Sequence, residues 1–165
     1  MSSSENYSQL TIPAPSFIRG AENSTCLHMA AYRGGAIEAQ PGRLLVEAGA
    51  DLEALDNDKS TPFFLACKAG NVPLVHLLKE KGCSISTPNG MGAEPLYVAA
   101  QMGHIKVIDA LLSFGADVNC RGCGTAPLHI ACMQARIAVI ERLINADGID
   151  LDLDSGKEKC KWDER

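Results

Sequence analysis

Residues 94 to 119 read EPLYVAAQMGHIKVIDALLSFGADVN and contain the signals for one complete structural unit. Pro95 suits the first turn of a helix, where its missing N–H costs nothing, and Gly103 suits a left-handed residue at the end of that helix. A second helix follows, with apolar residues at helical spacing, and ends at Gly115. The stretch therefore predicts two short helices joined by a tight turn, followed by an extended exit.

Neither helix can bury its apolar face alone, so the unit requires copies of itself. Each of four apolar residues lies seven positions before a glycine or an alanine; they are Leu27, Phe63, Leu96 and Leu128, before Gly34, Gly70, Gly103 and Ala135. The intervals between the four copies are 36, 33 and 32 residues. A period in this range is typical of a solenoid built from helix pairs.

Three of the copies carry a recognisable hexapeptide: TCLHMA at residues 25–30, TPFFLA at 61–66 and APLHIA at 126–131. These residues resemble the signature Thr-Pro-Leu-His-x-Ala of the ankyrin repeat. The resemblance covers about residues 22–152 and implies an all-α ankyrin-repeat solenoid of stacked helix-turn-helix units with β-hairpin or loop fingers. For function it implies a binding surface rather than a reaction.

The domain organisation follows from this pattern. Residues 1–21, rich in Ser, Thr, Asn and Pro, are expected to be a disordered leader, and 153–165 a charged tail. The ankyrin-repeat domain of residues 22–152 divides into repeats at about 22–54, 55–87, 88–120 and 121–152. Those repeats form one domain.

The first and last repeats depart from the pattern. Gln40-Pro41-Gly42 falls inside the expected second helix, where a proline removes a hydrogen bond, so we predict a turn at 36–39, a loop at 40–42 and a helix at 43–48. In the fourth repeat Ala126 cannot cap its helix, and Ala135 stands at a left-handed position that strains a Cβ. The alternatives for the interruption are a tolerated irregularity and a bulge that contacts a partner.

Composition excludes several classes of function. A net charge of −5 gives no basic footprint for nucleic acid, and the chain carries neither a signal-peptide pattern nor an apolar run long enough for a membrane span. Cys26, Cys67 and Cys132 occupy positions suited to small apolar side chains, which favours a reducing compartment. We therefore expect a protein of the cytoplasm, with the nucleus as a further possibility, that is a monomer on its own.

The ankyrin resemblance places binding residues at the ends of the first helices and on the fingers. Carried over position by position, the helix sites are Tyr32, Arg33, Lys68, Gln101, Met102, Met133 and Gln134, and the finger sites are Asn57, Asp58, Ser60 and Met91. Acidic residues cluster near the first finger, and the methionines offer adaptable apolar contacts. This surface suits a protein partner with a basic edge and an apolar centre, although only a minority of such residues carry large binding energies.

Three smaller features carry their own interpretations. His28 and His129 stand at the signature histidine, which implies a structural hydrogen bond. Cys120 and Cys123 form a Cys-x-x-Cys pair, but zinc needs four ligands and no second pair has matching spacing, so a thiol-redox or metal site is only an alternative. Asn119, eight residues after Leu111, matches a preference of the asparaginyl hydroxylase that modifies ankyrin repeats.

No convergent set of acid, base and nucleophile is evident. The sequence therefore favours a non-catalytic interaction or adaptor module without cofactor or metal. A small stoichiometric regulator similar in size to the four-repeat kinase inhibitors is the alternative within binding proteins, supported only by length and repeat number.

Overall fold

A computed structural model describes residues 23–33 and 40–153 of the chain. Within these ranges the chain forms eight helices and no strand. The helices are α1 (Cys26–Arg33), α2 (Gln40–Glu47), α3 (Pro62–Ala69), α4 (Val72–Glu80), α5 (Pro95–Met102), α6 (Ile105–Ser113), α7 (Pro127–Met133) and α8 (Ile137–Ile144). The predicted all-α solenoid of helix pairs is confirmed.

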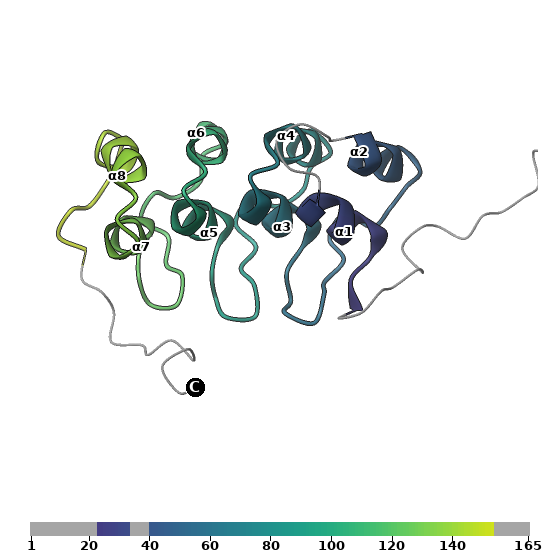
Figure 1. The fold of residues 1–165 in the computed structure, drawn as a ribbon, viewed down its shortest axis with the longest axis horizontal. Helices are drawn as coiled ribbons and strands as arrows, with labels where there is room; N and C mark the ends of the chain where they lie inside the picture. Colours follow the sequence, from purple (N-terminus) through teal and green to yellow (C-terminus); the bar gives the residue numbers. More distant parts are fainter. Residues whose placement is uncertain (1–22, 34–39, 154–165) are drawn as a thin grey trace, which may run out of the picture.

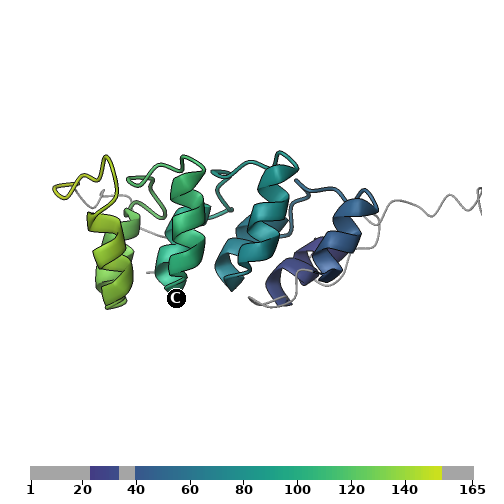
Figure 2. The ribbon, with the colours of Figure 1, turned by 90° about the horizontal axis from the view of Figure 1, so that it is seen from above.

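The helices form two rows (Figure 1). The first helices of the pairs, α1, α3, α5 and α7, make the inner row, and α2, α4, α6 and α8 make the outer row; the view from above shows the pairs following one another along the stack (Figure 2). The connections between pairs project as fingers below the inner row (Figure 1). In the described ranges the fingers are loops, with one isolated bridge between Gly122 and Thr125, rather than β-hairpins.

A continuous apolar core runs between the rows. From the inner row Leu27, Phe63 and Leu96 are each 1% exposed, and from the outer row Leu74 and Leu111 are fully buried. Each such side chain contributes about 1.5–3 kcal/mol through removal from water. Because every helix pair buries its apolar face against the neighbouring pairs, a single pair could not form this core on its own.

The middle of the stack has regular helix ends. Thr61 accepts a hydrogen bond from the Phe64 amide at 3.1 Å, which caps α3, and Gly70 ends that helix at φ +75°. Pro73 lies in the first turn of α4, where a proline is tolerated. Gly103 ends α5 in the same left-handed conformation as Gly70. These ends let two helices fold back on each other across only two residues.

The prediction of a loop at residues 40–42 is wrong. Helix α2 begins at Gln40, so Pro41 falls in its first turn and removes no helical hydrogen bond. Gly42 is buried against Leu74, since a Cβ there would lie 2.8 Å from Leu74 Cδ1. The unusual tripeptide therefore starts a helix and lets α2 approach α4. The turn predicted at 36–39, the leader of residues 1–21 and the tail beyond Leu153 lie outside the described residues.

The fourth repeat is irregular in the way that the sequence predicts. Ala126 makes no side-chain cap at the start of α7, and Ala135 adopts φ +51°. Glu94 also fails to cap α5 with its side chain. None of the described helices is long and apolar enough to cross a membrane.

Candidate functional site

The exposed ends of the inner helices form a row of their own. In α1, Ala31 is fully buried while Tyr32, the next residue, is 58% exposed; in α5, Ala100 is fully buried while Met102 is 37% exposed. Lys68 and Gln101 are half-buried, and Arg33, Met133 and Gln134 are exposed. Because all these positions are in the last turn of an inner helix or directly after it, they follow one line along the stack.

The fingers add a second set of exposed residues. Asn57, Asp58 and Met91 are all exposed. The carbonyl of Asp58 accepts a hydrogen bond from the Gly90 amide at 2.6 Å, which joins the first finger to the second. We call the exposed helix ends and these fingertips together the inner surface.

Ser60 does not belong to the inner surface. It is 3% exposed, its amide donates to Asp56 Oδ1 at 2.8 Å, and its carbonyl pairs with His28. The sequence places Ser60 on a finger correctly but cannot show that the residue lies where the finger enters the stack. Its contribution is to join two repeats rather than to face a partner.

Most acids near the first finger are occupied in shaping it. Asp51 Oδ1 accepts from the Glu53 amide at 3.1 Å, Asp56 binds Ser60 as above, and Glu53 Oε1 accepts from the Ser84 amide at 3.0 Å. These bonds fix the loop and link it to the following repeat. The acidic cluster near the first finger consists of Asp51, Glu53, Asp56 and Asp58, and of these Asp58 is the one whose carboxylate makes none of these contacts.

His28 has the structural role that the ankyrin resemblance implies. Its Nδ1 accepts from the Thr25 amide at 3.1 Å, and Thr25 Oγ1 lies 2.8 Å from the same nitrogen. With Nδ1 an acceptor, Nε2 carries the proton and donates to the Ser60 carbonyl at 2.9 Å. The ring is fully buried and therefore ties the first repeat to the second.

His129 lies at the same position in the fourth repeat without this network. Ala126 replaces the threonine, and the buried Nδ1 of His129 has no hydrogen-bond partner. A buried unpaired nitrogen costs about 1–3 kcal/mol. The same residue type is thus satisfied at one end of the stack and unsatisfied at the other.

Two further hydrogen bonds between neighbouring repeats were not predicted from the sequence. After the turns of the third and fourth repeats, a side chain reaches back to the previous inner helix: His104 Nε2 lies 3.1 Å from the Lys68 carbonyl, and Arg136 Nε lies 3.3 Å from the Gln101 carbonyl. These bonds hold the backbone of two inner-surface residues. The signal available in the sequence was a polar side chain directly after each turn.

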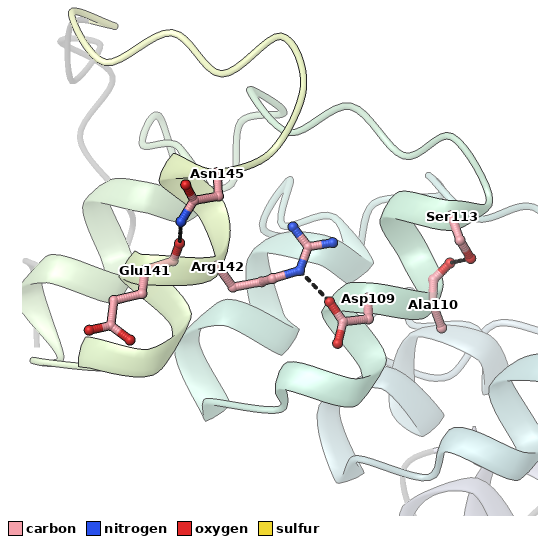
Figure 3. Close-up of polar contacts among 6 residues, drawn as sticks. All are labelled: Asp109, Ala110, Ser113, Glu141, Arg142 and Asn145. Atoms are coloured by element: carbon pink, nitrogen blue, oxygen red, sulfur yellow. Dashed lines mark hydrogen bonds and ion pairs between the residues drawn. The ribbon is translucent and has the colours of Figure 1, made fainter.

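The outer row is joined separately. Figure 3 shows Arg142 of α8 directed at Asp109 of α6, and their side chains form an ion pair. Asn145 caps the same end of α8 by donating to the Glu141 carbonyl at 2.6 Å (Figure 3). Since both charged partners are partly exposed, the pair contributes little to stability and serves mainly to align the two helices.

The Cys-x-x-Cys pair has unfavourable properties for thiol chemistry. Cys120 is 4% exposed, and burial, followed by the nearby Glu94 and Asp117, raises its pKa to about 12. A thiol with such a pKa is not a thiolate at neutral pH, whereas the thiolate is the reactive and metal-binding form. Among the described residues no group of three or more His, Cys, Asp or Glu side chains is arranged to hold a metal ion.

Cysteines in register with one another differ in environment. Cys67 is fully buried, as the repeat pattern predicts, but Cys132 is exposed. The expectation that both are small buried side chains is therefore wrong for Cys132. Cys132 is exposed because no further repeat among the described residues covers α7.

Asn119, the predicted hydroxylation site, makes two side-chain hydrogen bonds to the backbone of the loop after α8. Its side-chain amide donates to the Gly148 carbonyl at 2.8 Å, and its Oδ1 accepts from the Asp150 amide at 3.0 Å. The loop that follows α6 is thereby fixed to the loop that follows α8. Its modification stays a prediction.

The arrangement defines a class: a helical repeat scaffold that presents a long exposed surface along its inner helices and fingers. Two family models match the chain, one described as ankyrin repeats (3 copies) over residues 8–89 and one as ankyrin repeats (many copies) over residues 96–144. The chain belongs to the ankyrin-repeat family. Ankyrin repeats are generally protein–protein interaction modules and are typically non-catalytic.

Similar proteins cover diverse contexts. The chain is 38% identical over 79 residues to delta-latroinsectotoxin-Lt1a of Latrodectus tredecimguttatus, a match that spans 47% of this chain and 6% of the toxin. It is 36% identical over 81 residues to a putative ankyrin repeat protein of Rickettsia bellii, covering 46% of this chain and 45% of the relative. It is 34% identical over 105 residues to the NF-kappa-B inhibitor alpha of Sus scrofa, covering 59% of this chain and 32% of the inhibitor. The chain thus matches less than half the length of each of these relatives.

Proposed function

We propose that this chain is a non-catalytic interaction module that binds a protein partner through its inner surface. The contacts would come from the exposed ends of α1, α3, α5 and α7 and from the fingertips at Asn57, Asp58 and Met91. Its proposed compartment is the cytoplasm, with the nucleus as the alternative, and the buried free thiol of Cys67 supports this proposal.

One observation carries the proposal: large side chains are exposed on a rigid framework. Tyr32, Met102 and Met133 are 58%, 37% and 74% exposed. Each follows, by one or two residues, a helix position that is fully buried in the first three repeats, where Ala31, Cys67 and Ala100 occupy it. Aromatic and methionine side chains are enriched at protein interfaces. Because the helices that carry them are packed, little order is lost when a partner binds.

The chemistry of the inner surface describes the partner. Met91 and Met102 give an adaptable apolar centre, and Asp58 offers a negative charge at one edge. A segment with an apolar side chain flanked by basic residues is complementary to both. Tyr32 and Arg33 at the α1 end add an aromatic ring and a cation, residue types that often carry much of the binding energy at interfaces.

The experiment is affinity capture from cell extract with three immobilised forms of the chain. The test variant changes Tyr32, Arg33 and Met102 together to alanine, and the matched control changes Leu44, Lys106 and Ile144, which are exposed on outer-row helices. Proteins that bind the wild type and the control but lose at least about tenfold in affinity for the test variant would support the proposal. Partners retained by the test variant would overturn it.

A stoichiometric inhibitor is the second candidate. The observation in its favour is the similarity to a protein named NF-kappa-B inhibitor alpha. An inhibitor would lower the activity of its captured partner at a one-to-one ratio, whereas an adaptor would leave that activity unchanged and still bridge two proteins. Titration of the captured partner with the purified chain separates the two.

A further inference from the structure

The last inner helix carries a face that its equivalents bury. Leu128, His129 and Cys132 of α7 are in register with Leu96, Tyr97 and Ala100 of α5. The three residues of α5 are at most 6% exposed, but Leu128 and His129 are half-buried and Cys132 is exposed. The face of α7 is therefore shaped for a neighbour that the described residues do not supply.

This face is hollowed. A pocket of about 380 Å³ lies against it, lined by Leu128, His129, Cys132 and Met133 of α7 and by Ile149 and Leu151 of the loop that follows α8. Its walls are mainly apolar. The half-buried ring of His129 is the polar side chain of α7 at this site.

The opposite end of the stack has the complementary face. Met29 of α1 is 46% exposed, whereas the residues in register with it in α5 and α7, Val98 and Ile130, are 4% and 5% exposed. Ala30 is half-buried, whereas its counterparts Ala66 and Ala99 are fully buried. The two ends are thus the two halves of the interface that joins consecutive repeats inside the chain.

We propose that a second copy of this chain stacks its α1 face on the α7 face, so that the repeat–repeat interface continues between molecules. The template is internal: α1 packs on α3 with His28 Nε2 bonded to the Ser60 carbonyl at 2.9 Å. His129 presents the same ring at the end of the stack. The second copy carries the same Ser-Thr dipeptide, Ser24 and Thr25, immediately before α1.

This contact joins two different surfaces, so it does not close on itself. A head-to-tail interface leaves one free face of each kind in every dimer and permits further addition. The proposed association is concentration-dependent, and dilute protein should be monomeric. The inner surface lies along the side of the stack and is not needed for this contact, apart from Met133 at its end.

The experiment is sedimentation velocity of the purified chain over a series of concentrations. Two exposed residues are changed separately, Met29→Glu on the α1 face and Cys132→Glu on the α7 face, with Met91→Glu on a fingertip as the matched control. The wild type and the control should sediment faster as concentration rises, and each end variant alone should stay monomeric. An equimolar mixture of the two end variants should form a dimer of twice the monomer mass and nothing larger, because one intact face of each kind remains.

Three outcomes would overturn the proposal. They are a wild type that stays monomeric at every concentration, end variants that associate as the wild type does, and a mixture that forms no dimer. A monomeric wild type with Cys132 protected from a thiol reagent would assign the α7 face to another part of the same chain. Circular dichroism of each variant checks that the helices are retained.

Discussion

The middle of the stack, α3 to α6, and its last pair, α7 and α8, are built from the same pattern but differ in how completely it is realised. In the middle, Leu96 is 1% exposed and Gly103 ends its helix without strain. At the end, Leu128 is half-buried and Ala135 takes the left-handed position with a Cβ. The helices themselves have almost the same length in both places.

The difference shows that burial in this fold is supplied by neighbours rather than by the repeat itself. Stability in such proteins is close to a sum of unit terms and nearest-neighbour interface terms. A middle repeat has two interfaces, whereas the last described repeat has one. Equivalent substitutions should therefore have unequal effects, and pairs of them measure what an interface contributes.

The largest expected contrast is in thiol labelling of Cys67 and Cys132, which are in register in α3 and α7. Cys67 is fully buried and burial raises the pKa of its thiol above the ordinary value, so at pH 8 it is both inaccessible and protonated. Labelling of Cys67 then requires local opening, which slows it by on the order of a thousandfold for about 4 kcal/mol. Peptide mass mapping of dilute native protein measures both rates, and the same mapping in denaturant gives the control. Equal native rates would show that the α7 face is covered.

The next contrast concerns Leu96 and Leu128. Leu96→Ala should lower the free energy of unfolding by about 3 kcal/mol, because it leaves a cavity between two repeats. Leu128→Ala should cost about 1 kcal/mol, since that side chain is already half in water. Urea denaturation followed by circular dichroism compares the two. Equal losses would contradict the view that the missing neighbour accounts for the weaker end.

The fold was predictable because local signals and the repeat period agree. Thr61, Pro62 and Gly70 mark the two ends of one helix, and the same signals recur at a nearly constant interval. The start of α2 was predicted wrongly because Pro41 was expected to interrupt the helix, whereas it lies in the first turn. A proline breaks a helix interior but not a first turn, and only the position of Gln40 in the structure decides between these cases.

The candidate site was predictable in outline only. A repeat pattern locates the last turn of each inner helix, so Tyr32 and Met102 are correctly expected to be exposed. It does not give the path of the fingers, and that path buries Ser60. Nor does it give the reach of a side chain such as Arg136 to the previous repeat, because that contact depends on the spacing between helices rather than on sequence distance.

The two signature histidines give a third contrast. His28→Ala removes a fully buried ring together with its bonds to Thr25 and Ser60, which should cost about 2 kcal/mol of unfolding free energy. His129→Ala removes a ring with an unpaired nitrogen and should cost less than about 1 kcal/mol. Urea denaturation again provides the measurement, with Lys106→Ala at an exposed outer-row position as a control. A larger loss at His129 than at His28 would contradict the view that His28 is the satisfied ring and His129 the unsatisfied one.

The smallest expected effect is at Ala135, where the end of the stack can be made more like the middle. Ala135→Gly relieves about 1–2 kcal/mol of left-handed strain at φ +51° but gives the unfolded chain about 0.5–1 kcal/mol of extra conformational freedom. The net gain is about 0.5–1 kcal/mol, which should raise Tm by about 2–4 °C in thermal denaturation. Ala138→Gly, at an exposed position inside α8, is the control and should lower Tm, because glycine there only weakens a helix. If Ala135→Gly lowered Tm as the control does, the left-handed turn would not be what weakens this end, and the missing neighbour of α7 would remain as its cause.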